Sequence, residues 1–130
     1  MMAGLALGTV AALELATAGH AGAADATMDY KIFCARCHGD GGHGDGPDGS
    51  TLSTKPQDFT DCAAMGKLTD EIIFNAIKGG GSSVGMPADM PAWGSDSSFR
   101  KSFDSAEVAL RIDNLTDYIR SMQQRRAAKD

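Results

Sequence analysis

Apolar residues recur at helical spacing in three segments of the chain. The clearest stripe lies near the C-terminus, where spacings of four and three alternate through Val108, Ile112, Leu115, Ile119 and Met122. This pattern predicts a helix from about residue 105 to residue 124. Asp104 and Glu107 stand three positions apart at its start, which is the spacing of a capping box.

Two shorter helices are predicted upstream. One runs from Thr69, a good N-cap, to Lys78, and three consecutive glycines end it. Its buried face consists of Ile72, Ile73, Ala76 and Ile77. The other runs from about Thr27 to Cys37, with apolar positions at Met28, Ile32 and Phe33.

The segments between these helices, 39–67 and 79–103, are rich in Gly, Asp, Ser and Pro and show no hydrophobic period. The sequence therefore predicts an all-α protein of three main helices and two long loops. Its 130 residues suffice for one domain, but a small, loop-rich domain buries little apolar surface by itself. The formal charge of −5, without a basic run, argues against a nucleic-acid partner.

Residues 1–23 differ from the rest of the chain. The first 18 are mostly Ala, Leu, Gly, Val and Met, broken by Glu14, and Ala21-Gly22-Ala23 fits a signal-peptidase site. We expect an exported protein whose domain spans 24–130, with a cleaved signal peptide of residues 1–23. An uncleaved anchor is the alternative, although this segment is short and interrupted for a membrane span.

The pentapeptide Cys34-Ala-Arg-Cys-His38 is the attachment signature of a c-type haem. Residues three apart share one helix face, so the thiols of Cys34 and Cys37 can both reach the edge of one porphyrin. His38 then offers an imidazole nitrogen to the iron. A zinc site is disfavoured because no second closely spaced ligand pair exists, and a thioredoxin-like motif would need a βαβ context.

A second axial ligand is sought in the loop of residues 79–103. Met86 and Met90 are both followed by proline there. Core methionines usually lie on helix faces, whereas a loop stiffened by proline is well suited to offer a thioether as an iron ligand. We favour Met90 because Trp93 follows closely and would cover the haem edge, with Met86 as the alternative.

Four segments together resemble a bacterial class I monohaem cytochrome c, over residues 27–122. They are Cys34-Ala-Arg-Cys-His38-Gly39, Lys55-Pro56-Gln57-Asp58-Phe59, Met90-Pro91-Ala92-Trp93-Gly94 and Leu115-Thr116-Asp117-Tyr118-Ile119-Arg120.

This resemblance implies a fold in which the first and last helices cross nearly at right angles, with Tyr30 or Phe33 against Leu115 or Tyr118. It also implies that a proline carbonyl, of Pro56 or alternatively Pro47, accepts a hydrogen bond from the second nitrogen of His38. Cys62 has no counterpart in the pattern. We expect this thiol to be buried and inert, with an intermolecular disulfide as the alternative.

A His/Met-ligated haem has both axial positions filled, which favours outer-sphere electron transfer over catalysis. We therefore expect a soluble periplasmic single-electron carrier of a respiratory chain, and no enzyme. The expected protein is monomeric, and its donor and acceptor dock transiently at the exposed haem edge. The alternatives are a small haem subunit of a membrane or dehydrogenase complex, and a five-coordinate haem protein that binds a gas or peroxide.

Overall fold

A computed structural model describes residues 20–100 and 103–129, and every regular element in these ranges is helical. The helices are α1 (His20–Asp29), η1 (Tyr30–Cys34), α2 (Ala35–His38), η2 (Gly49–Thr51), α3 (Cys62–Met65), α4 (Asp70–Gly79), η3 (Gly81–Val84), α5 (Ser97–Arg100) and α6 (Ser105–Ala127). The all-α prediction is confirmed. The greater part of the predicted signal peptide, residues 1–19, lies outside the described residues.

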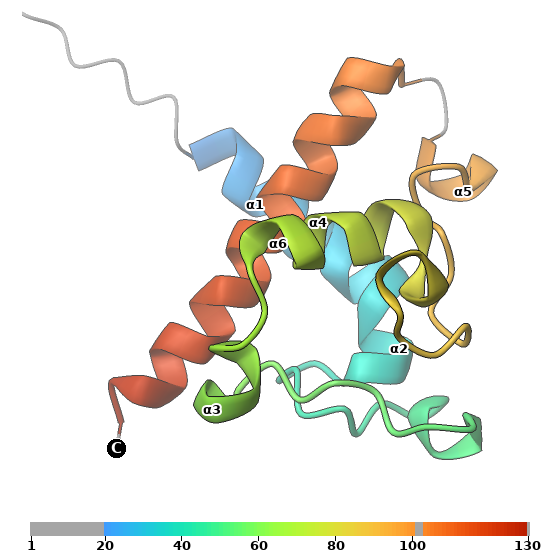
Figure 1. The fold of residues 1–130 in the computed structure, drawn as a ribbon. Coiled ribbons are helices and arrows are strands. Elements are labelled where there is room, and N and C mark those ends of the chain that lie inside the picture. The colour runs from blue at the N-terminus through green and yellow to red at the C-terminus, as the bar shows by residue number, and fades with distance from the viewer. Residues whose placement is uncertain (1–19, 101–102, 130) are drawn as a thin grey trace, which may run out of the picture.

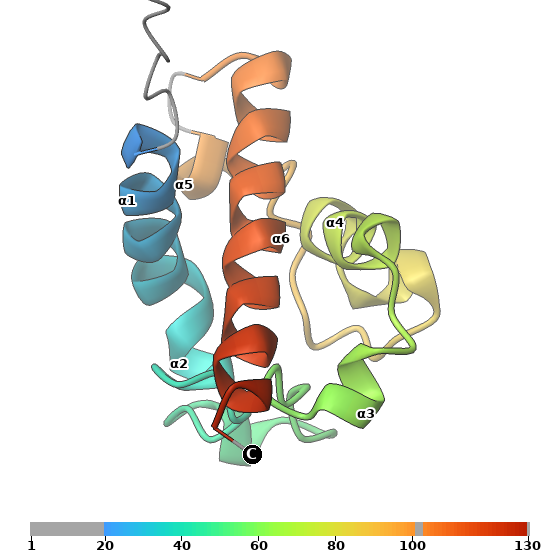
Figure 2. The ribbon, with the colours of Figure 1, turned by 90° about the vertical axis from the view of Figure 1, so that its left-hand side faces the viewer.

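Helix α6 runs the length of the molecule between two layers (Figures 1 and 2). In Figure 2, α1 and α2 lie on one side of it and α4 on the other. The stripe predicted from the sequence is buried in the core, because each of its five residues is at most 5% exposed. The long C-terminal helix therefore organises the core.

The ends of α4 and α6 follow from local chemistry. The side chain of Thr69 accepts from the amide of Ile72, and Gly80, at φ +79°, ends α4. Asp104 and Glu107 form the complete capping box at the start of α6. Both N-caps were predicted, and α6 continues three residues beyond its predicted end.

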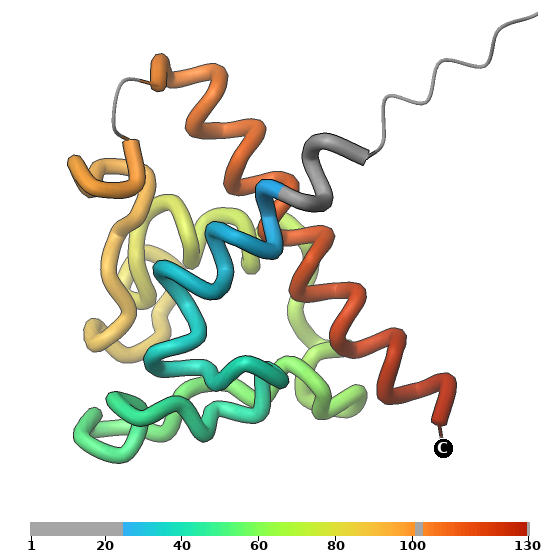
Figure 3. Tube along the Cα trace, turned by 180° about the vertical axis from the view of Figure 1, so that it is seen from behind, coloured from blue at the N-terminus to red at the C-terminus, as the bar shows by residue number. Residues whose placement is uncertain are grey.

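The first helical segment crosses α6, as Figure 3 shows from behind. Tyr30 is fully buried at the crossing, and its ring centroid lies 5.2 Å from that of Tyr118. The expected contact of Tyr30 with Tyr118 is thus confirmed. The buried face continues through Ala26 and Cys34, whereas Met28 and Ile32, two of the apolar positions of the predicted helix, are 59% and 51% exposed.

The two long loops contain short helices that periodicity did not reveal. The first loop includes η2 and α3, and the second includes η3 and α5. Each has only three or four residues, too few for a hydrophobic period. Cys62 begins α3 and is exposed, so the expectation of a buried thiol is wrong.

Candidate haem site

A turn of π-helix leads into the pentapeptide of residues 34–38. In η1 the amide of Ala35 bonds to the carbonyl of Tyr30, five residues back, before α2 begins. The hydroxyl of Tyr30 donates to the carbonyl of Gly39 at 2.8 Å, just after the pentapeptide. One buried tyrosine therefore ties together the two ends of residues 30–39, which we call the attachment segment.

The backbone of the first loop closes on α2. The amides of Gly44, Gly46 and Asp48 donate to the carbonyls of His38, Cys37 and Arg36 respectively, at 2.8, 3.2 and 2.8 Å. These bonds satisfy carbonyls that the end of a helix leaves unpaired. The loop thereby fixes the turn that carries His38.

His38 is oriented on two sides. Its Nδ1 lies 3.1 Å from the carbonyl oxygen of Gln57, and its ring stacks on Phe59 with centroids 4.3 Å apart and an interplanar angle of 17°. Burial lowers the pKa of His38, although the bond to Gln57 acts in the opposite direction. A neutral ring with its proton on Nδ1 leaves Nε2 as a free donor for a metal ion.

The hydrogen-bond acceptor for His38 differs from the prediction. Pro56 and Pro47 were the candidates, whereas the acceptor is the carbonyl of Gln57, one residue after Pro56. The Pro56 carbonyl instead lies against Gly44, where a Cβ would come within 2.3 Å of its oxygen. Gln57 and Phe59 both belong to the Lys55–Phe59 motif, but the sequence did not reveal their contacts with His38.

The thiols of Cys34 and Cys37 form no disulfide. Burial, with Asp29 and Cys37 nearby, raises the pKa of Cys34 to about 12, and burial also raises the pKa of Cys37. Reactive redox pairs contain a thiol whose pKa is lowered. The electrostatics of this pair therefore disfavour disulfide chemistry.

The candidate methionines lie in a segment that is tied to the end of α4. The Gly81 amide donates to the Met90 carbonyl at 3.1 Å, and the Trp93 amide donates to the Ile77 carbonyl at 3.0 Å. Met90 is partly buried and packs against the core. Met86 is also partly buried, and its amide donates to Gly81.

Aromatic rings connect this segment with the attachment segment. The Trp93 ring lies 5.3 Å from the ring of Phe33, the residue before Cys34. Phe99 packs edge-on against Phe33 at 5.2 Å. Residues predicted from two distant motifs are thus brought into one neighbourhood.

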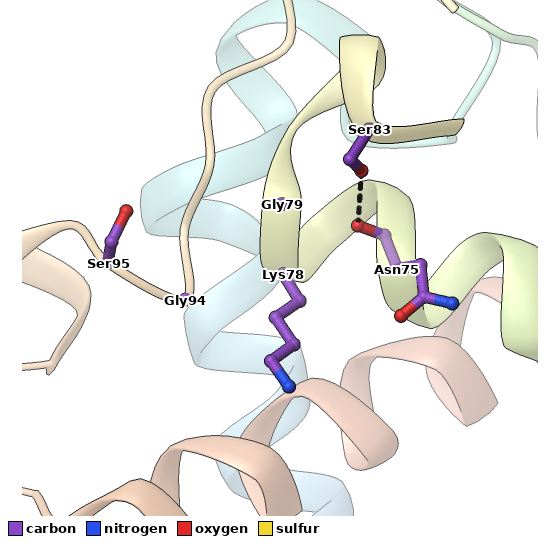
Figure 4. A pocket seen from close by; sticks show the side chains of 6 residues that line it. All are labelled: Asn75, Lys78, Gly79, Ser83, Gly94 and Ser95. Carbon is purple, nitrogen blue, oxygen red and sulfur yellow. Dashed lines mark hydrogen bonds between the residues drawn. The ribbon is translucent and has the colours of Figure 1, made fainter. Parts of the chain in front are cut away.

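A depression at the end of α4 lies beside this segment (Figure 4). It is lined by Asn75, Lys78, Gly79, Ser83, Gly94 and Ser95, and Ser83 donates to the Asn75 carbonyl at 3.0 Å. None of the predicted haem residues lines it. We therefore do not include it in the candidate site.

A family model described as cytochrome c oxidase, cbb3-type, subunit III matches residues 21–101. The chain belongs to this family of c-type cytochromes. Comparison with curated proteins and with solved structures gives no match. The matched range contains the pentapeptide and both candidate methionines, and the all-α structure is compatible with the cytochrome c fold.

Membership of this family implies a covalently bound c-type haem. The donor set fits this cofactor: two unpaired thiols at the required spacing, a neutral imidazole with Nε2 available, and a thioether in a tied segment. Within residues 20–100 and 103–129, no three His, Cys, Asp or Glu side chains form a metal-binding group. No helix in the described part of the chain is long and apolar enough to cross a membrane.

Proposed function

We propose that this cytochrome is a soluble periplasmic electron carrier with one haem attached through Cys34 and Cys37 and ligated by His38 and Met90. When bound, the haem supplies reversible one-electron exchange between ferric and ferrous iron. The observation that carries the proposal is the imidazole of His38, held by the Gln57 carbonyl and the Phe59 ring with Nε2 available. A ligand fixed in this way needs little rearrangement when the charge on the iron changes.

The residues of the second loop support methionine as the other ligand. Its backbone bonds to the end of α4 hold Met90 at the core, and the Trp93 ring packs on Phe33, the residue before Cys34. A thioether favours ferrous iron, and a filled sixth position disfavours binding of oxygen or peroxide. Both effects suit electron transfer rather than catalysis.

Absorption spectra of the matured protein, oxidised and reduced, test this proposal. We expect the weak far-red band that methionine sulfur gives on ferric iron. Met90→Ala should abolish the band, whereas the matched variant Met86→Ala should retain it. A wild-type protein that is high-spin and lacks the band would show that the sixth position is open, and the carrier proposal would be wrong.

A second candidate is a haem subunit of a membrane redox complex, for which the family description names a cbb3-type oxidase. The two proposals differ in where the native protein fractionates. A carrier is released with the periplasmic contents, whereas a subunit co-purifies with membranes and stays bound at high salt. The net negative charge of the protein would steer a carrier to basic docking surfaces on its redox partners. The rate of electron transfer between a carrier and such a partner should therefore fall as the salt concentration is raised.

A further inference from the structure

Arg111 lies in a partly buried position on α6, from which it contacts the first helix. Its Nε donates to Asp29 Oδ2 at 2.9 Å, and a terminal nitrogen donates to Asp29 Oδ1 at 2.5 Å. The side chains of this two-bonded pair are only 14% and 11% exposed. Such a pair is specific in geometry, and breaking it leaves a charge without a partner in a poorly solvated place.

The same guanidinium also holds the end of the methionine segment, by which we mean residues 90–99. A third nitrogen donates to the carbonyl of Phe99 in α5. The guanidinium carbon lies 4.2 Å from the ring centroid of Phe99 and 4.6 Å from that of Phe103. Arg111 thus joins α1, α5 and α6 through one side chain.

Phe99 transmits this restraint towards the candidate site. Its side chain is fully buried and packs on Phe33 at 5.2 Å and on Trp93 at 6.3 Å. The segment from Met90 to Phe99 therefore has two anchors. Its first part is bonded to α4, and its last part is held by Arg111.

We propose that Arg111 is a positioning residue that holds residues 90–99 in place beside the attachment segment, so that its loss would weaken ligation of a bound haem by Met90 more than it weakens the rest of the fold. This inference rests on the proposed function, in which Met90 is the axial ligand. Arg111 acts through its contacts with Asp29, Phe99 and Phe103.

Arg120 provides a matched control on the same helix. It also forms one carboxylate pair, with Asp70 at 2.6 Å, and donates to the carbonyls of Met65 and Leu68. These contacts join α6 to the segment from α3 to α4 and not to the methionine segment. Arg120→Gln and Arg111→Gln therefore remove comparable bonds from different parts of the molecule.

The test is titration of the ferric holoprotein with imidazole, which competes with methionine for the iron, alongside urea unfolding of each variant. Opening of the segment raises the apparent affinity in proportion to the open fraction, so Arg111→Gln should bind imidazole about tenfold more tightly than wild type. Arg120→Gln should change this affinity less than about twofold, even where its unfolding midpoint falls equally. Equal imidazole affinities in the two variants would overturn the proposal.

Asp29→Asn is a milder variant that leaves the Phe99 contacts of Arg111 in place, and it serves where Arg111→Gln does not fold. It should raise imidazole affinity in the same direction, and an unchanged affinity would count against the proposal. The far-red band of the wild-type protein separates the two levels of inference. A wild type without the band would overturn both the carrier proposal and the role of Arg111, whereas a wild type with the band and unresponsive variants would overturn only the latter.

Discussion

Gly46 lies where the first loop contacts the backbone of α2. A Cβ at this position would come within 2.4 Å of the Arg36 carbonyl oxygen and 2.5 Å of the Ala35 oxygen. Because both neighbours are backbone atoms, the collision cannot be relieved by a rotamer change. We expect Gly46→Ala to lower the free energy of unfolding by about 1–3 kcal/mol, measured by urea denaturation.

Gly85→Ala is the matched control for this substitution. A Cβ there meets nothing within 4 Å, but the residue has φ +74°, so alanine suffers only backbone strain of about 1 kcal/mol. If Gly46→Ala proves no more costly than Gly85→Ala, the close approach at Gly46 has no energetic weight.

Asp58 couples the same loop to pH. Burial alone would raise the pKa of Asp58, but hydrogen bonds from the hydroxyl and amide of Thr60, with His43 and Lys55 nearby, lower it overall. The unfolded chain therefore takes up this proton first as pH falls, at about pH 3.9. Between that pH and the lower pKa of the folded state, the unfolded chain binds more protons, so stability falls with falling pH.

Asp58→Asn removes this dependence. Urea unfolding measured from pH 6 down to pH 3 should show a shallower acid loss in the variant than in wild type. Parallel curves would mean that the hydrogen bonds from Thr60 do not lower the pKa of Asp58 in the folded protein below its value in the unfolded chain. The side chain is 36% exposed and solvent weakens its interactions, so we expect a change of slope rather than a large loss at neutral pH.

The residue that supports His38 shows the limit of sequence reasoning at this scale. The Lys55–Phe59 motif was found, and the expected acceptor was wrong by one residue, Gln57 instead of Pro56. Because every residue has a backbone carbonyl, the residue type does not indicate which carbonyl accepts the hydrogen bond from His38. Which carbonyl points at the imidazole depends on loop dihedrals that composition does not encode.

At the scale of elements, the capping box of α6 makes a quantitative prediction. The Asp104 carboxylate accepts from the amides of Ala106 and Glu107 at 2.8 and 2.9 Å. Because α6 carries the core stripe, fraying of its first turn reduces the stability of the whole domain. We expect Asp104→Ala to cost about 1 kcal/mol in urea unfolding.

Asp104→Asn should retain most of this stability, since an amide oxygen caps nearly as well as a carboxylate. Equal losses in the alanine and asparagine variants would indicate that charge, and not the hydrogen bonds of the cap, stabilises the helix start.

The elements that were predicted well are those with a period or a cap. Thr69 and Asp104 mark their helices correctly because their side chains bond to nearby amides, a strictly local interaction. The π-helical turn before Cys34 was missed, since its extra residue per turn leaves no compositional trace. Met28 and Ile32 have the spacing of a buried face, but they are exposed, and the face that packs against the core consists of Ala26, Tyr30 and Cys34.

At the scale of the whole molecule, long-range contacts bring separate motifs together. Arg111 joins α1, α5 and α6, and Arg120 joins α6 to the start of α4. Neither partner set follows from the sequence, because an arginine on a helix can reach in several directions and usually lies in solvent. The helical fold and the attachment motif were predictable, whereas the ties that hold the second loop in place required the structure.

The count of free thiols tests cofactor attachment and the position of Cys62 together. The chain has three cysteines, and thioethers at Cys34 and Cys37 would leave only Cys62, which is exposed at the start of α3. Native holoprotein should therefore react rapidly with one equivalent of a chromogenic disulfide reagent, and denaturation should release no further thiol. Cys62→Ser should react with none, while its intact mass still includes the haem. Two additional thiols on denaturation would show that the cofactor is not covalently attached, and a native protein that reacts only after denaturation would show that Cys62 is covered in solution.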